Sequence, residues 1–265
     1  MKSRIAILTV ISLLIISTVL TAGRLPFTTR GSEKAADYGL DELMEMMKQT
    51  AVEALVNQDT NLRAGIESGA KLAGPLPRGS RVEILMDRQE EWYYVRDLLN
   101  DKKGWVRGEA LDIPPDEPAD ESRMSKIQLE AYANAMGYDS KTGWLILVDI
   151  RRQQTHIFKG RKGKWTLNRS MIVSTGKNTS PTIRGQFILE NRGLWFYSQR
   201  LGSGGKFWVR FQGAYLFHSV AMDKDGNIID NTLGQKSSNG CVRLSLDEAE
   251  WFFRNVADGS RVVIL

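Results

Sequence analysis

Thiol and imidazole side chains are few in this chain, which contains one cysteine and two histidines. Cys241 follows Gly240 in the segment SSNGCVRL, where a glycine allows a tight turn that directs successive backbone N–H groups to one point. His218 ends the apolar run AYLF, and Ser219 follows it. A thiol becomes a nucleophile when a base takes its proton, and acyl transfer also needs N–H donors for the oxyanion. Cys241 and His218 are therefore the candidates for a thiol–imidazole pair that transfers acyl groups.

These residues also have structural interpretations. His156 lies in the alternating segment THIF beside Lys159, and a position on a surface strand accounts for it without catalysis. An isolated cysteine is commonly an inert core residue, and Arg243 could serve in a structural ion pair. With Cys241 alone, neither an intramolecular disulfide nor a metal site of the CxxC type can form. We expect no metal and no cofactor.

Several phrases in the second half of the chain resemble one catalytic family, the YkuD-type L,D-transpeptidase domain. The resemblance extends from Trp144 to Leu265. The phrases, in the order of the family, are VSTGK (173–177), SPTIRGQF (180–187), His218, Leu233-Gly234 and Ser238-Asn239-Gly240-Cys241-Val242-Arg243-Leu244. Several phrases in a fixed order are far more specific than a single motif.

The chain departs from the family pattern at three points. Asn239 replaces the histidine of the motif, and Ile183 stands where a second proline is common. Nineteen residues separate His218 from Ser238, slightly more than is usual. The extra length falls on the turn-forming string DKDGN (223–227), which predicts an enlarged hairpin.

The resemblance implies a β-sandwich catalytic domain that acts on the stem peptides of peptidoglycan. Cys241 would attack the carbonyl of the third stem residue, a diamino acid, and expel the terminal D-alanine to leave a thioester. The side-chain amine of another stem would resolve the thioester; water in its place would make the protein a carboxypeptidase. His218 would be the base, held by a neighbouring carbonyl or by Ser219. The other expected site residues are the oxyanion donors Gly240 and Cys241, the supporting Asn239 and Ser238, and Arg243, which would orient the motif or a substrate carboxylate.

Other thiol enzymes of the cell surface fit this chain less well. NlpC-type endopeptidases place the cysteine before the histidine. Sortases have a much longer gap between the two and a TLxTC phrase that this sequence lacks. The alternative from another class is a non-catalytic wall-binding protein, in which Asn239 marks a decayed site.

Short alternating runs separated by Gly/Pro turns predict a small β-domain over residues 51–113. Its phrases resemble the bacterial Src-homology-3-like domain, a small β-barrel, with Ile66 at a position usually held by proline: NLRAG (61–65), LPRGSRVEIL (76–85), EWYYVR (91–96) and KGWVRGEAL (103–111). The resemblance implies a domain that binds the wall and takes no part in catalysis.

A linker and a second, larger β-domain follow. Residues 114–124 are rich in proline and acidic residues, which predicts an irregular linker. The catalytic domain then occupies 125–265, with a short helix over 125–136 and one late helix whose shared apolar face includes Ala249 and Phe252. Strands are expected at 144–150, 155–158, 165–174, 186–189, 207–211 and 214–217. The glycine- and aromatic-rich segment 191–206 reads as a substrate lid or as a mobile loop. The fold class is therefore mainly β.

The first residues have the pattern of an export signal. Lys2 and Arg4 precede the uncharged apolar run from Ile5 to Ala22, so we expect residues 1–23 to be a signal peptide or an N-terminal membrane anchor. Residues 24–50 would be a spacer that ends in a short amphipathic helix. This pattern predicts an extracytoplasmic protein of the cell envelope.

The charge is unevenly distributed. Residues 24–123 hold 14 Lys/Arg against 20 Asp/Glu, whereas residues 124–265 hold 20 against 11. The basic second half favours an anionic partner, and together with the resemblance it indicates the anionic cell wall and not a nucleic acid. With 42% hydrophobic residues, the chain is not of the disordered class.

Overall fold

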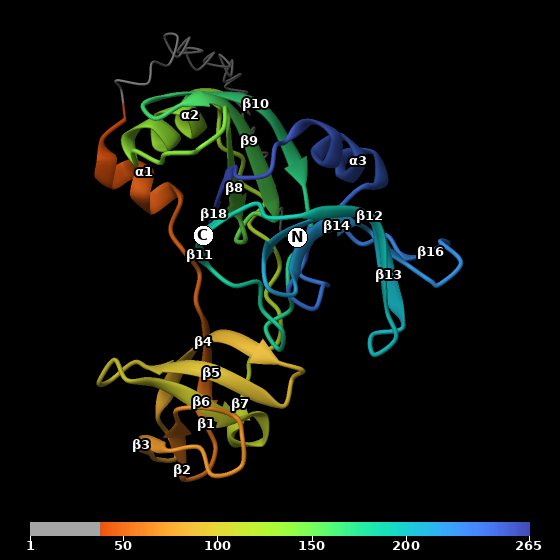
Figure 1. Ribbon diagram of the computed structural model, residues 1–265. Helices are drawn as coiled ribbons and strands as arrows, with labels where there is room; N and C mark the ends of the chain where they lie inside the picture. The colour runs from red at the N-terminus through yellow and green to blue at the C-terminus, as the bar shows by residue number, and fades with distance from the viewer. Residues whose placement is uncertain (1–37) are drawn as a thin grey trace, which may run out of the picture. The chain divides into compact units, whose positions relative to one another are not determined.

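The structure, a computed structural model, describes residues 38–265, which belong to one compact unit distinct from the first 33 residues. The predicted signal or anchor (1–23) and much of the spacer lie outside the described residues. Strands make up 43% and helices 13% of the described residues, so the prediction of a mainly β protein is confirmed (Figure 1). Within residues 38–265, no helix combines the length and the apolar character needed to cross a membrane.

The first sheet is antiparallel and has seven strands in the order β3-β2-β6-β5-β4-β1-β7. The strands are β1 (Val52–Val56), β2 (Thr60–Arg63), β3 (Leu72–Leu76), β4 (Arg81–Arg88), β5 (Trp92–Asp97), β6 (Lys103–Arg107) and β7 (Leu111–Asp112), with a 3-10 turn, η2 (Gly108–Ala110), before the last. Side chains of β5 alternate between buried and half-buried, which leaves Tyr93 and Val95 in the core of this sheet. No helix or strand occurs between Ile113 and Ser125, in agreement with the predicted linker.

Two further sheets face each other in the second half of the chain. One has the order β10-β9-β8-β18-β11, and the other has the order β16-β15-β13-β14-β17 with β12 paired to β13. Their strands are β8 (Trp144–Asp149), β9 (Gln154–Arg161), β10 (Lys164–Ile172), β11 (Gly185–Ile188), β12 (Arg192–Ser198), β13 (Ser203–Gln212), β14 (Tyr215–Ser219), β15 (Ala221–Met222), β16 (Ile228–Asp230), β17 (Val242–Leu244) and β18 (Arg261–Ile264).

The five-stranded sheet is buried on both faces. In β8, Ile146 and Val148 face the core between the two sheets, whereas Leu145 and Leu147 face a second core beneath the helices. β18 pairs in parallel with β8 and alternates in the same way. Burial on both faces explains why these strands read as unbroken apolar runs, WLILV and VVIL.

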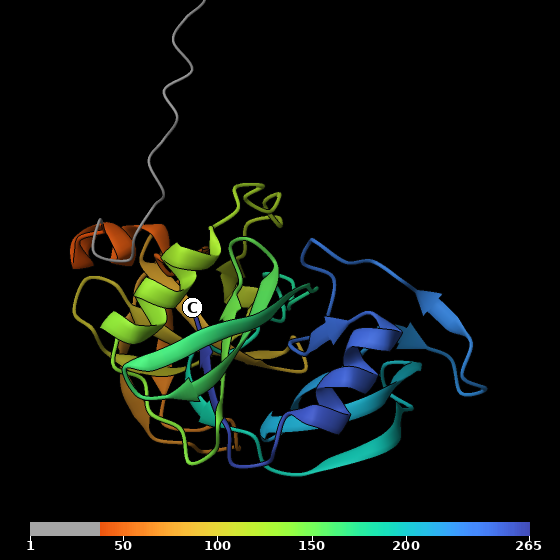
Figure 2. The same ribbon diagram turned by 90° about the horizontal axis from the view of Figure 1, so that it is seen from above.

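Three helices of the described residues pack against the sheets of the second half: α1 (Leu40–Met46), α2 (Lys126–Ala135) and α3 (Leu246–Asn255). α1 precedes the first sheet in the chain. α1 and α2 cover the outer face of the five-stranded sheet, and α1 ends earlier than its apolar spacing predicts. Ser125 and Gln128 form a capping box that starts α2. α3 buries Ala249 and Phe252 against β14 and its neighbours (Figure 2).

The structure corrects one expected element and confirms another. Segment 191–206 is not a mobile loop, because Arg192–Ser198 forms β12 and pairs with β13 as a hairpin. The string DKDGN forms the turn between β15 and β16, with Asp223 N–H donating to Asn227 O at 2.9 Å, so a hairpin lies where the sequence predicts it.

Candidate active site

Cys241 lies at the end of a tight turn, immediately before β17. Gly240 in this turn has a φ of 97°, and a Cβ at that position would lie 2.6 Å from Cε1 of Tyr215. Only glycine fits this combination of backbone and space. Ser238 Oγ closes the turn by donating to Cys241 O at 2.6 Å. The positive φ thus falls on Gly240, as the sequence predicts, and the neighbouring Asn239 is half-buried.

Strand pairing brings the turn that carries Cys241 beside the strand that carries His218. β14 runs parallel to β17, with Phe217 opposite Val242 and His218 opposite Arg243. Cys241 lies one residue before β17, and its Sγ contacts Ala214 O and the N–H of Leu216. Leu216 lies on β14, two residues before His218.

His218 is held as a neutral base by its own chain neighbour. Its Nδ1 lies 2.6 Å from Ser219 O, and because a carbonyl can only accept, Nδ1 carries the proton and Nε2 keeps its lone pair. Burial, and to a smaller extent the charge of Arg243, lower the pKa of His218 to about 3. The ring of Phe196 lies edge-on to the imidazole at 5.0 Å. The orienting group is thus the carbonyl of Ser219, while its hydroxyl accepts from Lys206 N–H at 2.9 Å.

Cys241 rests as a thiol. Burial raises the pKa of its side chain to about 11, although the N–H of Leu216 and the charges of Arg243 and Arg210 act in the opposite direction. The Sγ donates to Ala214 O at 3.7 Å. A neutral thiol beside a neutral imidazole requires that the proton move to His218 as the sulfur attacks a carbonyl.

Arg243 forms an ion pair beneath the turn. Its Nη1 lies 2.6 Å from Asp230 Oδ2 on β16 and 3.4 Å from Ser237 Oγ, and the residue is 8% exposed. Its buried Nε has no hydrogen-bond partner among residues 38–265. These contacts tie the turn to the β15–β16 hairpin, and the binding of a substrate carboxylate by Arg243 stays a prediction.

His156 is buried, not on the surface as its alternating segment suggested. It is 2% exposed because α1 and α2 cover that face of β9. Its Nδ1 contacts Ser170 Oγ at 2.8 Å, and burial lowers its pKa to about 4. His156 faces away from the core between the sheets, so it takes no part in the Cys241–His218 pair.

Sequence reasoning missed Thr182, which anchors the turn from below. Its Oγ1 donates to Gly240 O at 2.8 Å and accepts from Gly176 N–H at 2.8 Å. The phrases VSTGK and SPTIRGQF, which include Gly176 and Thr182, signalled this region without revealing the contact. The hydroxyl of Thr182 thus links both phrases to the turn that carries Cys241.

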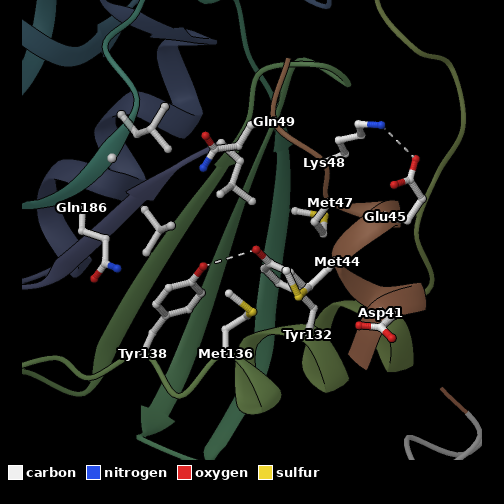
Figure 3. A pocket seen from close by; sticks show the side chains of 14 residues that line it. Asp41, Met44, Glu45, Met47, Lys48, Gln49, Tyr132, Met136, Tyr138 and Gln186 are labelled. Atoms are coloured by element: carbon white, nitrogen blue, oxygen red, sulfur yellow. Dashed lines mark hydrogen bonds and ion pairs between the residues drawn. The ribbon is translucent and has the colours of Figure 1, made fainter. Parts of the chain in front are cut away.

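A pocket of ≈ 690 Å³ lies elsewhere, between α1, α2 and the C-terminal strand (Figure 3). Met44, Met47, Met136 and Tyr138 are among its lining residues, and neither Cys241 nor a histidine reaches it. Among the described residues, no group of three or more His, Cys, Asp or Glu side chains is arranged to hold a metal ion.

Comparison with known proteins finds matches to the second half of the chain. Residues 143–264 match the family described as the L,D-transpeptidase catalytic domain, YkuD. A protein of Bacillus subtilis (strain 168) described as a candidate L,D-transpeptidase, YciB, is 35% identical over 126 residues, which is 44% of this chain and 63% of that protein. This chain therefore spans less than two thirds of that relative. The prediction of a YkuD-type catalytic domain is confirmed.

Solved structures show weaker likenesses. One is a fused Zn-dependent amidase/peptidase/peptidoglycan-binding domain-containing protein from Clostridium acetobutylicum ATCC 824, with 30% identity, a TM-score of 0.45, and coverage of 53% of this chain and 59% of that one. Another is an L,D-transpeptidase from Mycobacterium tuberculosis H37Rv, with 14% identity, a TM-score of 0.38, and coverage of 81% and 80%.

Proposed function

We propose that this protein is a peptidoglycan L,D-transpeptidase that joins stem peptides through a thioester on Cys241. The observation that carries the proposal is the parallel pairing of β14, which holds His218, with β17, which directly follows Cys241. The match of residues 143–264 to the catalytic domain supplies the reaction class.

In the first step, Nε2 of His218 takes the thiol proton while Sγ of Cys241 attacks the carbonyl of the third stem residue. The oxyanion that forms is stabilised by the backbone N–H groups of Gly240 and Cys241. When the tetrahedral intermediate collapses, the C–N bond breaks, His218 returns the proton to the leaving amine, and D-alanine departs. Cys241 then holds the acyl group as a thioester.

In the second step, the side-chain amine of another stem attacks the thioester. His218 accepts the proton of that amine, the new amide forms, and the sulfur of Cys241 leaves and regains a proton. Attack by water in place of the amine gives a carboxypeptidase. The acceptor thus decides between a cross-link and a shortened stem.

The experiment is to incubate the full-length protein with purified tetrapeptide-bearing muropeptides and to identify the products by mass. We expect cross-linked dimers and released D-alanine. Cys241→Ala, which keeps the fold and removes the one thiol, should give neither product. Shortened stems without dimers would indicate the carboxypeptidase. Binding to sacculi with no product and no carbapenem adduct on Cys241 would indicate a non-catalytic wall-binding protein.

The rest of the chain fits an enzyme that works outside the cytoplasm. The first sheet would be a bacterial Src-homology-3-like domain that binds the wall, as its phrases from 61 to 111 suggest. Residues 1–23 would export the protein or anchor it in the membrane, and the basic second half would favour the anionic wall. Fractionation of cells that express the tagged protein should place it in the envelope; recovery in the cytoplasm would refute this assignment.

A further inference from the structure

The loop of residues 176–184 contacts both the first sheet and the turn that carries Cys241. The sequence predicts that these two parts belong to separate domains. The loop begins within the VSTGK phrase and leads into β11. The loop doubles back so closely that a Cβ on Gly176 would lie 2.2 Å from Ser180 O. Most of its residues are buried, so its conformation depends on the groups that surround it.

On its inner side the loop reaches the turn that carries Cys241. Thr182 is 3% exposed and donates to Gly240 O, as described above. The carbonyl of Gly240 belongs to the peptide group whose N–H, on Cys241, is one of the proposed oxyanion donors. A shift of Thr182 therefore tilts that peptide group and moves its N–H away from the reacting carbonyl.

On its outer side the loop is held by the first sheet. The hydroxyl of Tyr93, on β5, donates to Thr179 O at 2.9 Å. Burial raises the pKa of Tyr93 to about 12, so the phenol keeps its proton. Asp87, on β4, accepts from Ser180 Oγ at 2.9 Å. Both contacts come from the hairpin that joins β4 to β5.

A buried ion pair and an apolar contact extend the same interface. Arg184, at the end of the loop, forms an ion pair with Glu83 of β4, and Glu83 is 7% exposed. Met86 of β4 packs against the core between the second and third sheets. Tyr215, whose ring lies against Gly240, has a pKa raised by burial and then by the charges of Asp87 and Cys241. The hairpin thus lies close to the nucleophile.

We propose that the first sheet positions the active site: the β4–β5 hairpin fixes the 176–184 loop, and through Thr182 the loop fixes the peptide group between Gly240 and Cys241. This inference rests on the proposed function and adds to it a role for the first sheet in acyl transfer itself. Tyr93 and Asp87 are positioning residues, because they act through the loop and do not touch the reacting atoms.

The test compares full-length Tyr93→Phe/Ser180→Ala, which removes two hydroxyl donors at this contact, with Tyr94→Phe. Tyr94 is the next residue on β5, and its ring packs on Trp105 at 5.3 Å within the first sheet. We measure acylation of Cys241 by a carbapenem, as intact mass against time and concentration, and amide hydrogen exchange of peptides that cover 176–184 and 238–241. Tyr93→Phe alone is the milder variant if the double variant melts early.

We expect the limiting acylation rate of the double variant to fall about tenfold, which corresponds to roughly 1.4 kcal/mol, with the half-saturating carbapenem concentration unchanged. Exchange should quicken in both peptides, and Tyr94→Phe should match the wild type in every measurement. Unchanged exchange at 238–241 would overturn the inference, even if residues 176–184 exchange faster. If the wild-type protein is not acylated, the proposed function fails, and the exchange at 238–241 still decides whether the first sheet positions the turn.

Discussion

The geometry of the turn that carries Cys241 depends on one hydroxyl group, that of Thr182. Removing this hydroxyl tests whether it positions the turn. Thr182→Val keeps the shape of the side chain and deletes both hydrogen bonds of Oγ1, to Gly240 O and from Gly176 N–H. Thr182, Gly176 and Gly240 are all buried, so water cannot replace the lost partner. The valine variant leaves one buried carbonyl and one buried N–H unpaired.

The expected loss of stability follows from the unpaired carbonyl of Gly240 and the unpaired N–H of Gly176. A buried polar group left without a partner costs about 1–3 kcal/mol, so the free energy of unfolding should fall by about 2–6 kcal/mol. The acylation rate of Cys241 should also fall by about tenfold or more, since the peptide group that carries its N–H loses its anchor. Thr182→Ser keeps the hydroxyl and loses one methyl group, which should cost about 1 kcal/mol and leave acylation near the wild-type rate.

The assays are urea denaturation followed by tryptophan fluorescence and the time course of carbapenem acylation followed by intact mass. Fluorescence reports mainly on the second half of the chain, which holds five of the seven tryptophans: Trp144, Trp165, Trp195, Trp208 and Trp251. A Thr182→Val variant as stable and as rapidly acylated as Thr182→Ser would refute the reasoning. A variant that loses stability but keeps its acylation rate would show that Thr182 supports the fold without positioning the turn.

Three further predictions concern the base, the turn and the pH dependence. His218→Ala should slow acylation by about 10² to 10⁴, the usual worth of a general base, and His156→Ala should leave the rate nearly unchanged; equal effects would mean that the wrong base is assigned. Gly240→Ala should nearly abolish acylation, because φ is 97° and the new Cβ would meet Tyr215 at 2.6 Å, whereas Asn239→His should stay within about tenfold, a difference of roughly 1.4 kcal/mol. Similar losses in the two variants would point to a role for the Asn239 side chain. Burial lowers the pKa of His218 to about 3 and raises the pKa of Cys241 to about 11, so the thiol and the imidazole both stay neutral and the acylation rate should be flat from about pH 5 to about pH 8. Stopped-flow acylation with a midpoint near pH 6.5 would contradict this, since it would require an ordinary, exposed histidine.

Local pattern predicted much of the fold. The late helix follows from an apolar face that includes Ala249 and Phe252, with acidic residues in its first turn. β8 follows from a run of large apolar residues, whereas β18 was not predicted although its residues form a similar run. Segment 191–206 was missed because its glycines suppress the strand pattern, while its pairing with β13 over Arg192–Ser198 provides the order that composition does not show.

The types of the catalytic residues were also available from the sequence, since one cysteine, two histidines and a family phrase leave little choice. The strand pairing that brings their two segments together was not available from the sequence. Cys241 and His218 come together because β14 and β17 pair in parallel, a contact between strands that are separated along the chain by the β15–β16 hairpin. The sequence left open whether a carbonyl or the side chain of Ser219 orients His218, and the structure shows that the carbonyl of Ser219 does so.

Burial was the property that only the tertiary structure decided. The alternation of apolar and polar residues around His156 is the same whether water or helices cover the outer face of β9. In the structure α1 and α2 cover this face and bury His156. The contacts of the 176–184 loop with Tyr93 and Asp87 likewise join residues far apart in sequence, which no local pattern encodes. A short stretch of sequence specifies which side chains share a face, but what covers that face depends on packing between distant segments.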